Sequence, residues 1–209
     1  MLVDKIAKYL NISLFFALLV VISVLVILDI NPSGKRTVLH SVIKPNGLVD
    51  GPRPADRLLG VVGNGMSAAW EVAIDPVYFE LYIPRLYQRI TFELIIDPGE
   101  QDIIELGGLG SSQGWQVSLK PAFDASLTST EQPEKVDEEY YKLSATFMPE
   151  ELFLAGHIYT FVVSAPDLKT NNHTLKIREA NFYLEKEPIT LANLPDKAQR
   201  FWQRLMSKF

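Results

Sequence analysis

The chain begins with its longest apolar stretch. Residues 9–28 contain no charged side chain, and Leu, Val, Ile and Phe surround a helix drawn through them. At about 1.5 Å rise per residue, such a helix is about 30 Å long, which matches the hydrocarbon core of a bilayer. The residues that follow, Asp-Ile-Asn-Pro-Ser-Gly, offer no signal-peptide cleavage site. The pattern predicts an uncleaved transmembrane anchor over 9–30 behind a tail of residues 1–8. A cleaved signal peptide and a buried core helix fit less well.

Basic residues flank both ends of this apolar run. Lys5 and Lys8 precede it, and Lys35, Arg36 and Lys44 follow it, so the positive-inside rule does not choose an orientation. A short tail followed directly by an apolar helix is the usual layout of a signal anchor. On that layout we expect a single-pass protein of the cell membrane, with a cytoplasmic N-terminus and its larger part outside the cytoplasm.

Between about residues 58 and 189, apolar and polar residues alternate in short runs. In one of them Ile90, Phe92, Leu94 and Ile96 fall on the same face of a strand. Pro, Gly, Asp and Asn separate the runs, as they do at turns. This pattern predicts a mainly β fold, an antiparallel β-sandwich of jelly-roll type, with a closed barrel as the main alternative. We expect strands at 69–74, 78–83, 90–96, 103–106, 115–119, 140–147, 157–164 and 175–185. The expected core includes Phe92, Leu94, Phe147, Phe161, Val163 and Ile177.

Two stretches lack this alternation. Pro and Gly recur through residues 31–57, which predicts a connector between the anchor and the sandwich. Its one apolar patch, residues 38–43, fits either an edge strand or a spacer. Residues 126–139 are polar and acidic and predict a long loop, with an ordered flap over a binding face as the alternative.

The chain ends in a helical pattern. Over residues 190–209 the apolar side chains recur at spacings of three and one, which places them within an arc of about 140° on a helix, and basic residues share one flank. This predicts a basic amphipathic helix that docks on the sandwich itself, on an anionic membrane surface or in the groove of a partner protein. The residues expected at a membrane or partner contact are Arg200, Phe201, Trp202, Arg204, Leu205, Met206 and Phe209.

Composition narrows the classes of function. The chain has 209 residues, a formal net charge of -5, three His and no Cys. Without Cys it holds no disulfide, thiolate nucleophile or Cys-ligated zinc. An acidic balance argues against nucleic acid as a partner. Because no triad, metal motif or cofactor motif is found, we expect a protein that is not an enzyme, with no catalytic residue, cofactor or metal.

Two glycine-rich stretches and one acidic turn have alternative interpretations as binding loops. Residues 107–114 lack the Lys and the Ser or Thr of a phosphate loop, so we interpret them as a flexible loop between strands. Residues 60–65 lack the spacing and the strand–helix context of a dinucleotide site. The acidic turn gathers the oxygen ligands that calcium prefers, but its spacing matches no defined calcium loop, and a solvated turn is the simpler interpretation. The acidic residues of this turn are Asp97, Glu100, Asp102 and Glu105.

Aromatic residues suggest one further site. A flat ring presents an apolar face to the C–H face of a sugar, while nearby polar groups bind the hydroxyls. The alternative is that most of these rings fill the core and edges of the sandwich. The candidate ligand platform consists of Tyr78, Tyr82, Tyr87 and Trp115.

Three stretches carry a resemblance to a known class of proteins. They read Asp-Pro-Val-Tyr-Phe-Glu-Leu-Tyr-Ile-Pro-Arg from residue 75, Ile-Glu-Leu-Gly from residue 104 and Tyr-Thr-Phe-Val-Val-Ser-Ala-Pro from residue 159. These stretches resemble uncharacterised membrane-anchored β-sandwich proteins of bacteria, in which the sandwich looks like the galactose-binding and carbohydrate-binding jelly rolls. The resemblance implies the fold and assigns no ligand residue.

These patterns lead to one hypothesis of function and two alternatives. We expect a non-catalytic, membrane-anchored, extracytoplasmic β-sandwich protein that acts in binding or assembly at the cell surface. The alternatives are a carbohydrate-binding module that holds cell-wall or surface glycan, and an accessory subunit of a larger membrane protein complex. The expected partners are the lipid bilayer and either surface glycan or other membrane proteins. A row of exposed aromatics on one sheet face favours the glycan module, and a broad apolar patch favours the subunit.

Overall fold

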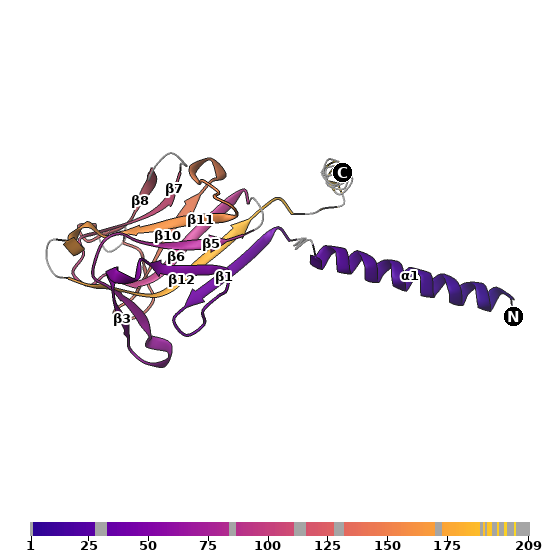
Figure 1. The fold of residues 1–209 in the computed structure, drawn as a ribbon, viewed down its shortest axis with the longest axis horizontal. Coiled ribbons are helices and arrows are strands. Elements are labelled where there is room, and N and C mark those ends of the chain that lie inside the picture. Colours follow the sequence, from indigo (N-terminus) through magenta and orange to yellow (C-terminus); the bar gives the residue numbers. More distant parts are fainter. Residues whose placement is uncertain are drawn as a thin grey trace. The chain divides into compact units, whose positions relative to one another are not determined.

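The computed structural model describes residues 2–27, 33–83, 87–110, 116–127, 132–169 and 173–188, with a few single positions after these. The chain divides into two compact units. Residues 35–186 form one of them, and residues 1–34 together with 187–209 form the other. All the strands belong to the unit of residues 35–186 (Figure 1).

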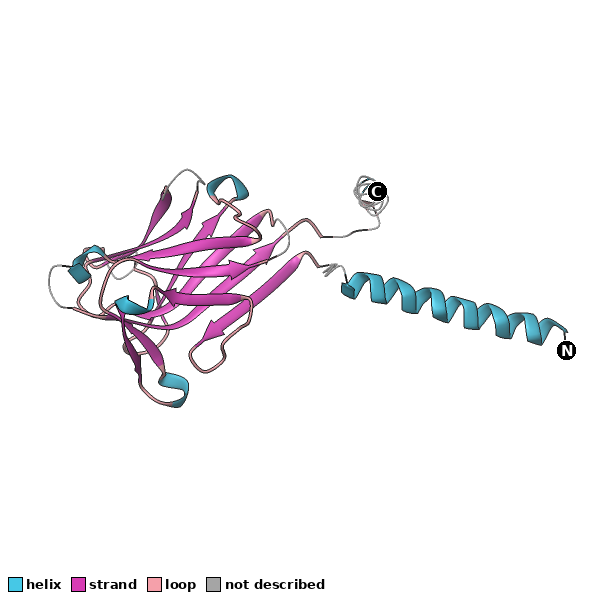
Figure 2. Cartoon of the chain, viewed as in Figure 1, coloured by secondary structure: helices cyan, strands magenta, loops and turns pink. Residues whose placement is uncertain are grey.

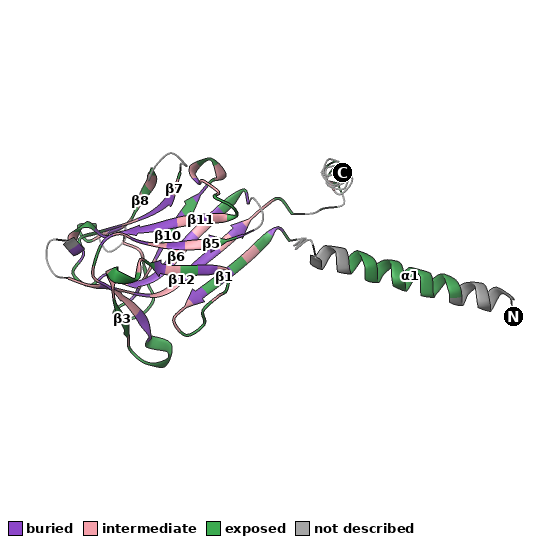
Figure 3. Ribbon diagram, in the orientation of Figure 1, coloured by how far each residue is buried: buried purple, intermediate pink, exposed green. Residues whose placement is uncertain are grey.

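The described part of the other unit contains helix α1 (Leu2–Ile27). Its described side chains, from Tyr9 to Ile22, are all exposed (Figure 3). No helix among the residues that the structure describes is long and apolar enough to cross a membrane. The transmembrane anchor over 9–30 and its orientation stay predictions of the sequence. The seven contact residues predicted on the C-terminal helix lie outside the described residues.

The predicted antiparallel sandwich of two sheets is confirmed (Figure 2). One sheet has seven strands, of which six follow one another in the order β3 (Leu58–Val62), β4 (Ala69–Val72), β12 (Leu175–Glu185), β6 (Arg89–Asp97), β10 (Tyr141–Phe147) and β9 (Glu134–Lys135); the seventh, β1 (Lys35–Ser41), pairs with β12. The other sheet has five, in the order β2 (Val49–Arg53), β5 (Val77–Tyr82), β11 (Ile158–Ser164), β7 (Ile103–Leu109) and β8 (Val117–Asp124). Short 3-10 helices lie at Ala55–Arg57, Gly65–Ser67, Pro149–Glu151 and Pro166–Lys169.

Strand β12 organises the seven-stranded sheet because it is the longest strand. It pairs with β6 over nearly its whole length. On its other edge, residues 175–177 pair with β4 and residues 179–185 pair with β1. Two strands from distant parts of the chain therefore share one edge of β12, and together they leave little of that edge unpaired.

The core lies between the two sheets and follows the predicted alternation. Six residues were expected there, and all six are buried: Phe92, Leu94, Phe147, Phe161, Val163 and Ile177. Phenylalanine rings from facing strands meet at its centre. The Phe161 ring lies 5.2 Å from the rings of Phe92 and Phe182 and 5.7 Å from that of Phe147, between centroids. Such tilted and edge-on ring pairs are a favourable geometry for aromatic packing.

Three expectations about loops need correction. The predicted connector over 31–57 contains β1 and β2, and the sandwich unit begins at Lys35. Pro is tolerated in β2 because β2 is an edge strand, where a missing N–H costs no ladder bond. Gly107 and Gly108, expected in a loop, lie in β7. The polar stretch 126–139 contains the short strand β9.

Candidate functional site

Two tyrosines of the predicted platform stand on one outer face of the sandwich. In β5, Phe79 and Leu81 point into the core, so Tyr78, Glu80 and Tyr82 point to the outside of the five-stranded sheet. Tyr82 is 49% exposed, whereas Tyr78 is half-buried. Tyr82 lies four positions after Tyr78 along the strand, which is about 13 Å at the usual rise of about 3.3 Å per residue.

Neighbouring strands place polar side chains beside these rings. Thr160 of β11 is in register with Glu80. On the other side, Arg53 and Asp50 of β2 are in register with Tyr78 and Glu80, and they form an ion pair with each other. We name this surface the tyrosine face. It consists of Asp50, Arg53, Tyr78, Glu80, Tyr82 and Thr160.

The same sheet continues as a low apolar surface over β7 and β8. Gly107 of β7 is in register with Leu119 of β8. A Cβ atom at Gly107 would lie only 2.6 Å from Val117 Cγ1 and 2.7 Å from Leu119 Cδ2. Glycine is therefore needed here, because it lets these two side chains lie across β7 and keeps this part of the face flat.

The tyrosine face combines the two kinds of contact that a sugar needs. The tyrosine rings offer apolar surface to C–H groups, and their hydroxyls remain polar. Between the rings, Glu80 is an acceptor for sugar hydroxyls and Thr160 is both donor and acceptor. This arrangement can hold a ligand that has an apolar face and a hydroxyl-rich edge.

The two other platform residues do not join this face. Tyr87 is only 4% exposed and belongs to the core, with the Lys186 ammonium 5.8 Å from its ring centroid. Its assignment to a ligand platform was wrong, because alternation cannot tell a tyrosine at the margin of the core from an exposed one. Trp115 lies outside the described residues.

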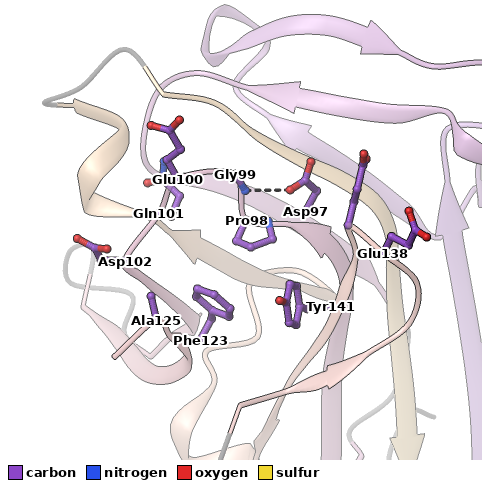
Figure 4. A pocket seen from close by; sticks show the side chains of 11 residues that line it. Asp97, Pro98, Gly99, Glu100, Gln101, Asp102, Phe123, Ala125, Glu138 and Tyr141 are labelled. Atoms are coloured by element: carbon purple, nitrogen blue, oxygen red, sulfur yellow. Dashed lines mark hydrogen bonds between the residues drawn. The ribbon is translucent and has the colours of Figure 1, made fainter. Parts of the chain in front are cut away.

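Three residues of the predicted acidic turn, Asp97, Glu100 and Asp102, line a cavity of about 490 Å³ beside Phe123 and Tyr141 (Figure 4). Two of their carboxylates already have partners. Asp97 Oδ2 accepts a hydrogen bond of 2.9 Å from Lys176 Nζ, and Glu100 Oε2 lies 2.9 Å from His173 Nε2. Among the described residues, no group of three or more acidic or histidine side chains is placed to hold a metal ion.

The sequence analysis missed a polar cluster on the outer face of the seven-stranded sheet. Glu179, Asn181 and Tyr183 of β12 point outward there, and Glu93 of β6 is in register with Asn181. The available signal in the sequence was Asn181, a polar residue between Ala180 and Phe182 in an apolar strand. Its link to Glu93 depends on the pairing of β6 with β12, which the sequence does not reveal.

Comparisons with known proteins find similar solved structures but no family for this chain. No family model matches the chain, and no curated protein matches it. Among solved structures, the xylan-binding module CBM15 has 12% identity and a TM-score of 0.45, and covers 73% of this chain and 99% of its own. The mannan-recognising carbohydrate-binding module TmCBM27 has 12% identity and a TM-score of 0.42, and covers 72% of this chain and 99% of its own. A carbohydrate-binding module specific for non-crystalline cellulose, CBM28, has 12% identity and a TM-score of 0.35. The match covers 76% of this chain and 96% of that module.

By their names, these three similar structures are carbohydrate-binding modules. Identities and TM-scores this low carry no argument about what this chain binds.

Proposed function

We propose that this protein is a non-catalytic glycan-binding protein that holds a neutral polysaccharide on the tyrosine face. The alignment of Tyr78, Glu80 and Tyr82 on one outward side of β5 carries this proposal. The criterion set from the sequence favours it, because an exposed tyrosine and a half-buried tyrosine follow one another on a sheet face with a hydroxyl-binding group between them. Of the hypotheses drawn from the sequence, the carbohydrate-binding module is therefore favoured.

The flatness of the surface supports a polysaccharide as the ligand. The tyrosine face and the low apolar surface over β7 and β8 lie on the same side of one sheet. A sugar chain can lie across such a surface with its C–H faces on the rings. The Glu80 carboxylate and the Thr160 hydroxyl, which lie opposite each other, then bind hydroxyls at the edge of one sugar unit.

Alanine substitution of Tyr82 tests this proposal. Affinity electrophoresis and calorimetry of the full chain against soluble xylan, mannan and hydroxyethylcellulose would identify a polysaccharide that binds. Loss of the exposed ring in Tyr82→Ala is then expected to weaken binding about tenfold, whereas Tyr82→Phe keeps most of it. Leu39→Ala is the matched control, because Leu39 is 55% exposed and lies on the other sheet. If no neutral polysaccharide binds, or if Tyr82→Ala binds like the wild type, the proposal is wrong.

We also propose that residues 9–30 anchor the protein in the cell membrane and that the sandwich lies outside the cytoplasm. The uncharged run of residues 9–28 supports the anchor. Resistance to alkaline extraction of membranes tests the anchor, and digestion of the sandwich by protease added to intact cells tests the side. If alkaline treatment extracts the protein completely, residues 9–30 do not anchor it. If the protease digests the sandwich only after the cells are lysed, the sandwich does not lie outside the cytoplasm.

The predicted amphipathic helix at residues 190–209 belongs to the same proposal. Its aromatic and basic residues suit the headgroup region of an anionic membrane. Vesicle binding that weakens with added salt and with Trp202→Ala supports this contact. If removal of residues 195–209 instead lowers the melting temperature without any vesicle binding, the helix packs on the protein itself.

A further inference from the structure

The polar cluster on the seven-stranded sheet lies at the centre of its outer face. It consists of Glu93 of β6 and of Glu179, Asn181 and Tyr183 of β12, and we name it the acceptor cluster. Strand β1 borders it on one side and β10 on the other. It therefore stands on the side of the sandwich opposite to the tyrosine face.

One amide joins the two carboxylates of the cluster. Asn181 Nδ2 donates hydrogen bonds to Glu93 Oε1 at 3.4 Å and to Glu179 Oε2 at 3.3 Å. The Tyr183 hydroxyl donates to the same Glu93 oxygen at 3.0 Å. The pKa of Tyr183 is raised, first by burial and then by this hydrogen bond, so the hydroxyl remains a donor at neutral pH.

Acceptors outnumber donors in this cluster. The carboxylates of Glu93 and Glu179 offer four oxygens, and Asn181 Oδ1 is a fifth acceptor. The only side-chain donors within the cluster are Asn181 Nδ2 and the Tyr183 hydroxyl. Asn181 is 4% exposed, yet its Oδ1 has no hydrogen-bond partner among the described residues. A buried acceptor without a donor is uncommon, and a donor supplied from outside the chain would complete the network.

Nearby cations do not neutralise the two carboxylates. No ion pair within the described ranges joins Glu93 or Glu179 to a basic side chain. Lys142 lies across the sheet on β10, but its ammonium pairs with Glu134. That hydrogen bond is the main cause of the raised pKa of Lys142, and the charge of Glu93 adds a smaller contribution. Arg89 is likewise engaged with Glu185.

Hydroxyl side chains border the cluster on both sides, next to the apolar Leu39 of β1 and Ile95 of β6. Ser144 of β10 is in register with Glu93, and Thr37 of β1 is in register with Tyr183. Thr91 and Thr146 are joined by a hydrogen bond of 2.9 Å between their Oγ1 atoms. These groups form a polar strip across four strands, and such hydroxyls can exchange hydrogen bonds with sugar hydroxyls.

We propose that the acceptor cluster is a second binding site, which takes a glycan bearing primary ammonium groups. An ammonium brings three N–H donors and one positive charge, which match the surplus acceptors and the two carboxylates that lack a cation. The Tyr183 ring adds a surface that attracts a cation. The hydroxyls around the cluster suit a sugar chain better than an extended peptide. This site does not rest on the proposed function of the tyrosine face.

A pair of matched oligosaccharides tests this site. The probes are a hexamer of glucosamine and its fully N-acetylated counterpart, which has the same backbone without the charge. The assay is calorimetry on the full chain at a pH where the amines are protonated. The glucosamine hexamer is expected to bind at least tenfold more tightly than its N-acetylated counterpart. One charge-assisted hydrogen bond is enough to change the dissociation constant by about tenfold. Added salt should weaken this binding.

Isosteric variants locate the binding. Glu93→Gln combined with Glu179→Gln removes both charges but keeps oxygens for the Asn181 amide, and it should weaken binding of the glucosamine hexamer at least tenfold. An unchanged unfolding midpoint shows that the variant is folded; if it is not, Glu179→Gln alone replaces it. Tyr82→Ala is the control on the opposite sheet, and it should leave this binding unchanged.

Several outcomes would overturn the second site. Equal binding of the two hexamers, or no binding of either, contradicts it. If the folded variant with both glutamines binds the glucosamine hexamer as tightly as the wild type does, the amine binds outside the acceptor cluster. If an oligolysine peptide of equal charge binds through these glutamates and the glucosamine hexamer does not, the site takes a peptide and the assignment to a glycan is wrong. Loss of neutral-polysaccharide binding in Tyr82→Ala bears only on the tyrosine face.

Discussion

Deletion of residues 35–57 should unfold the sandwich or leave it barely stable. These residues supply β1 and β2, one edge element for each sheet. The sequence pattern predicted that the sandwich begins at about residue 58. The structure instead shows a compact unit that begins at Lys35.

The magnitude follows from what the two strands bury. Val38 of β1 is 2% exposed and Val49 of β2 is 7% exposed, and both belong to the core. Burial of one such side chain stabilises a protein by about 1.5–3 kcal/mol, so the two contribute about 3–6 kcal/mol. The deletion also removes the seven residue pairs of β1 with β12 and the His40 ring, which stacks on Trp70 with centroids 5.3 Å apart. A total stability of about 5–15 kcal/mol leaves little margin for this loss.

Urea unfolding of two fragments measures the effect. Circular dichroism should show that residues 35–186 unfold in one cooperative transition, whereas residues 58–186 show none or a midpoint near zero urea. Val38→Asp in the full chain tests the same contact without a deletion, and Leu39→Asp is its control because Leu39 points outward. If the shorter fragment unfolds with a free energy within about 1 kcal/mol of the longer one, β1 and β2 do not stabilise the core as argued.

Three further predictions concern single side chains. Phe161→Ala should cost about 3–5 kcal/mol in urea unfolding because it empties the space between three other rings, and a loss below about 1 kcal/mol contradicts this packing. Burial lowers the pKa of His40 in the folded state, so the unfolded chain binds the proton more readily and stability should fall as the pH drops below about 6.5. In His40→Phe this dependence on pH should disappear; an equal slope in both proteins rules out His40 as its source. The hydrogen bond from Arg178 lowers the pKa of Asp137 in the folded state. This hydrogen bond therefore stabilises the fold at pH values above the pKa of Asp137 in the unfolded chain, and the stabilisation is lost as the pH falls through its pKa in the folded state. An NMR titration of Asp137 should have a midpoint below about 3.9, and Arg178→Ala should raise it; a midpoint that the substitution does not move refutes the pairing.

Much of the fold follows from the local pattern of the sequence. The alternation at Phe92 and Leu94 identified the inward face of β6, because side chains point to opposite sides of a strand in turn and only one side of each sheet meets the other sheet. The same rule placed Tyr78 and Tyr82 on one side of β5 before any pairing was known. Strand position and core membership are local consequences of burial on one face, so one segment at a time is enough to predict them.

Tertiary pairing decided the rest. The stretch rich in Pro and Gly at residues 35–57 became strands because the free edges of β12 and β5 offered hydrogen-bond partners, and a partner elsewhere in the chain outweighs weak local propensity. Tyr87 and Tyr82 look alike in the sequence, and only the packing of the surrounding strands buried one ring and exposed the other. The acceptor cluster exists because β6 lies beside β12, which brings Glu93 to Asn181 from 88 residues away. No local pattern encodes that register, because it results from the closure of the whole sandwich around its core.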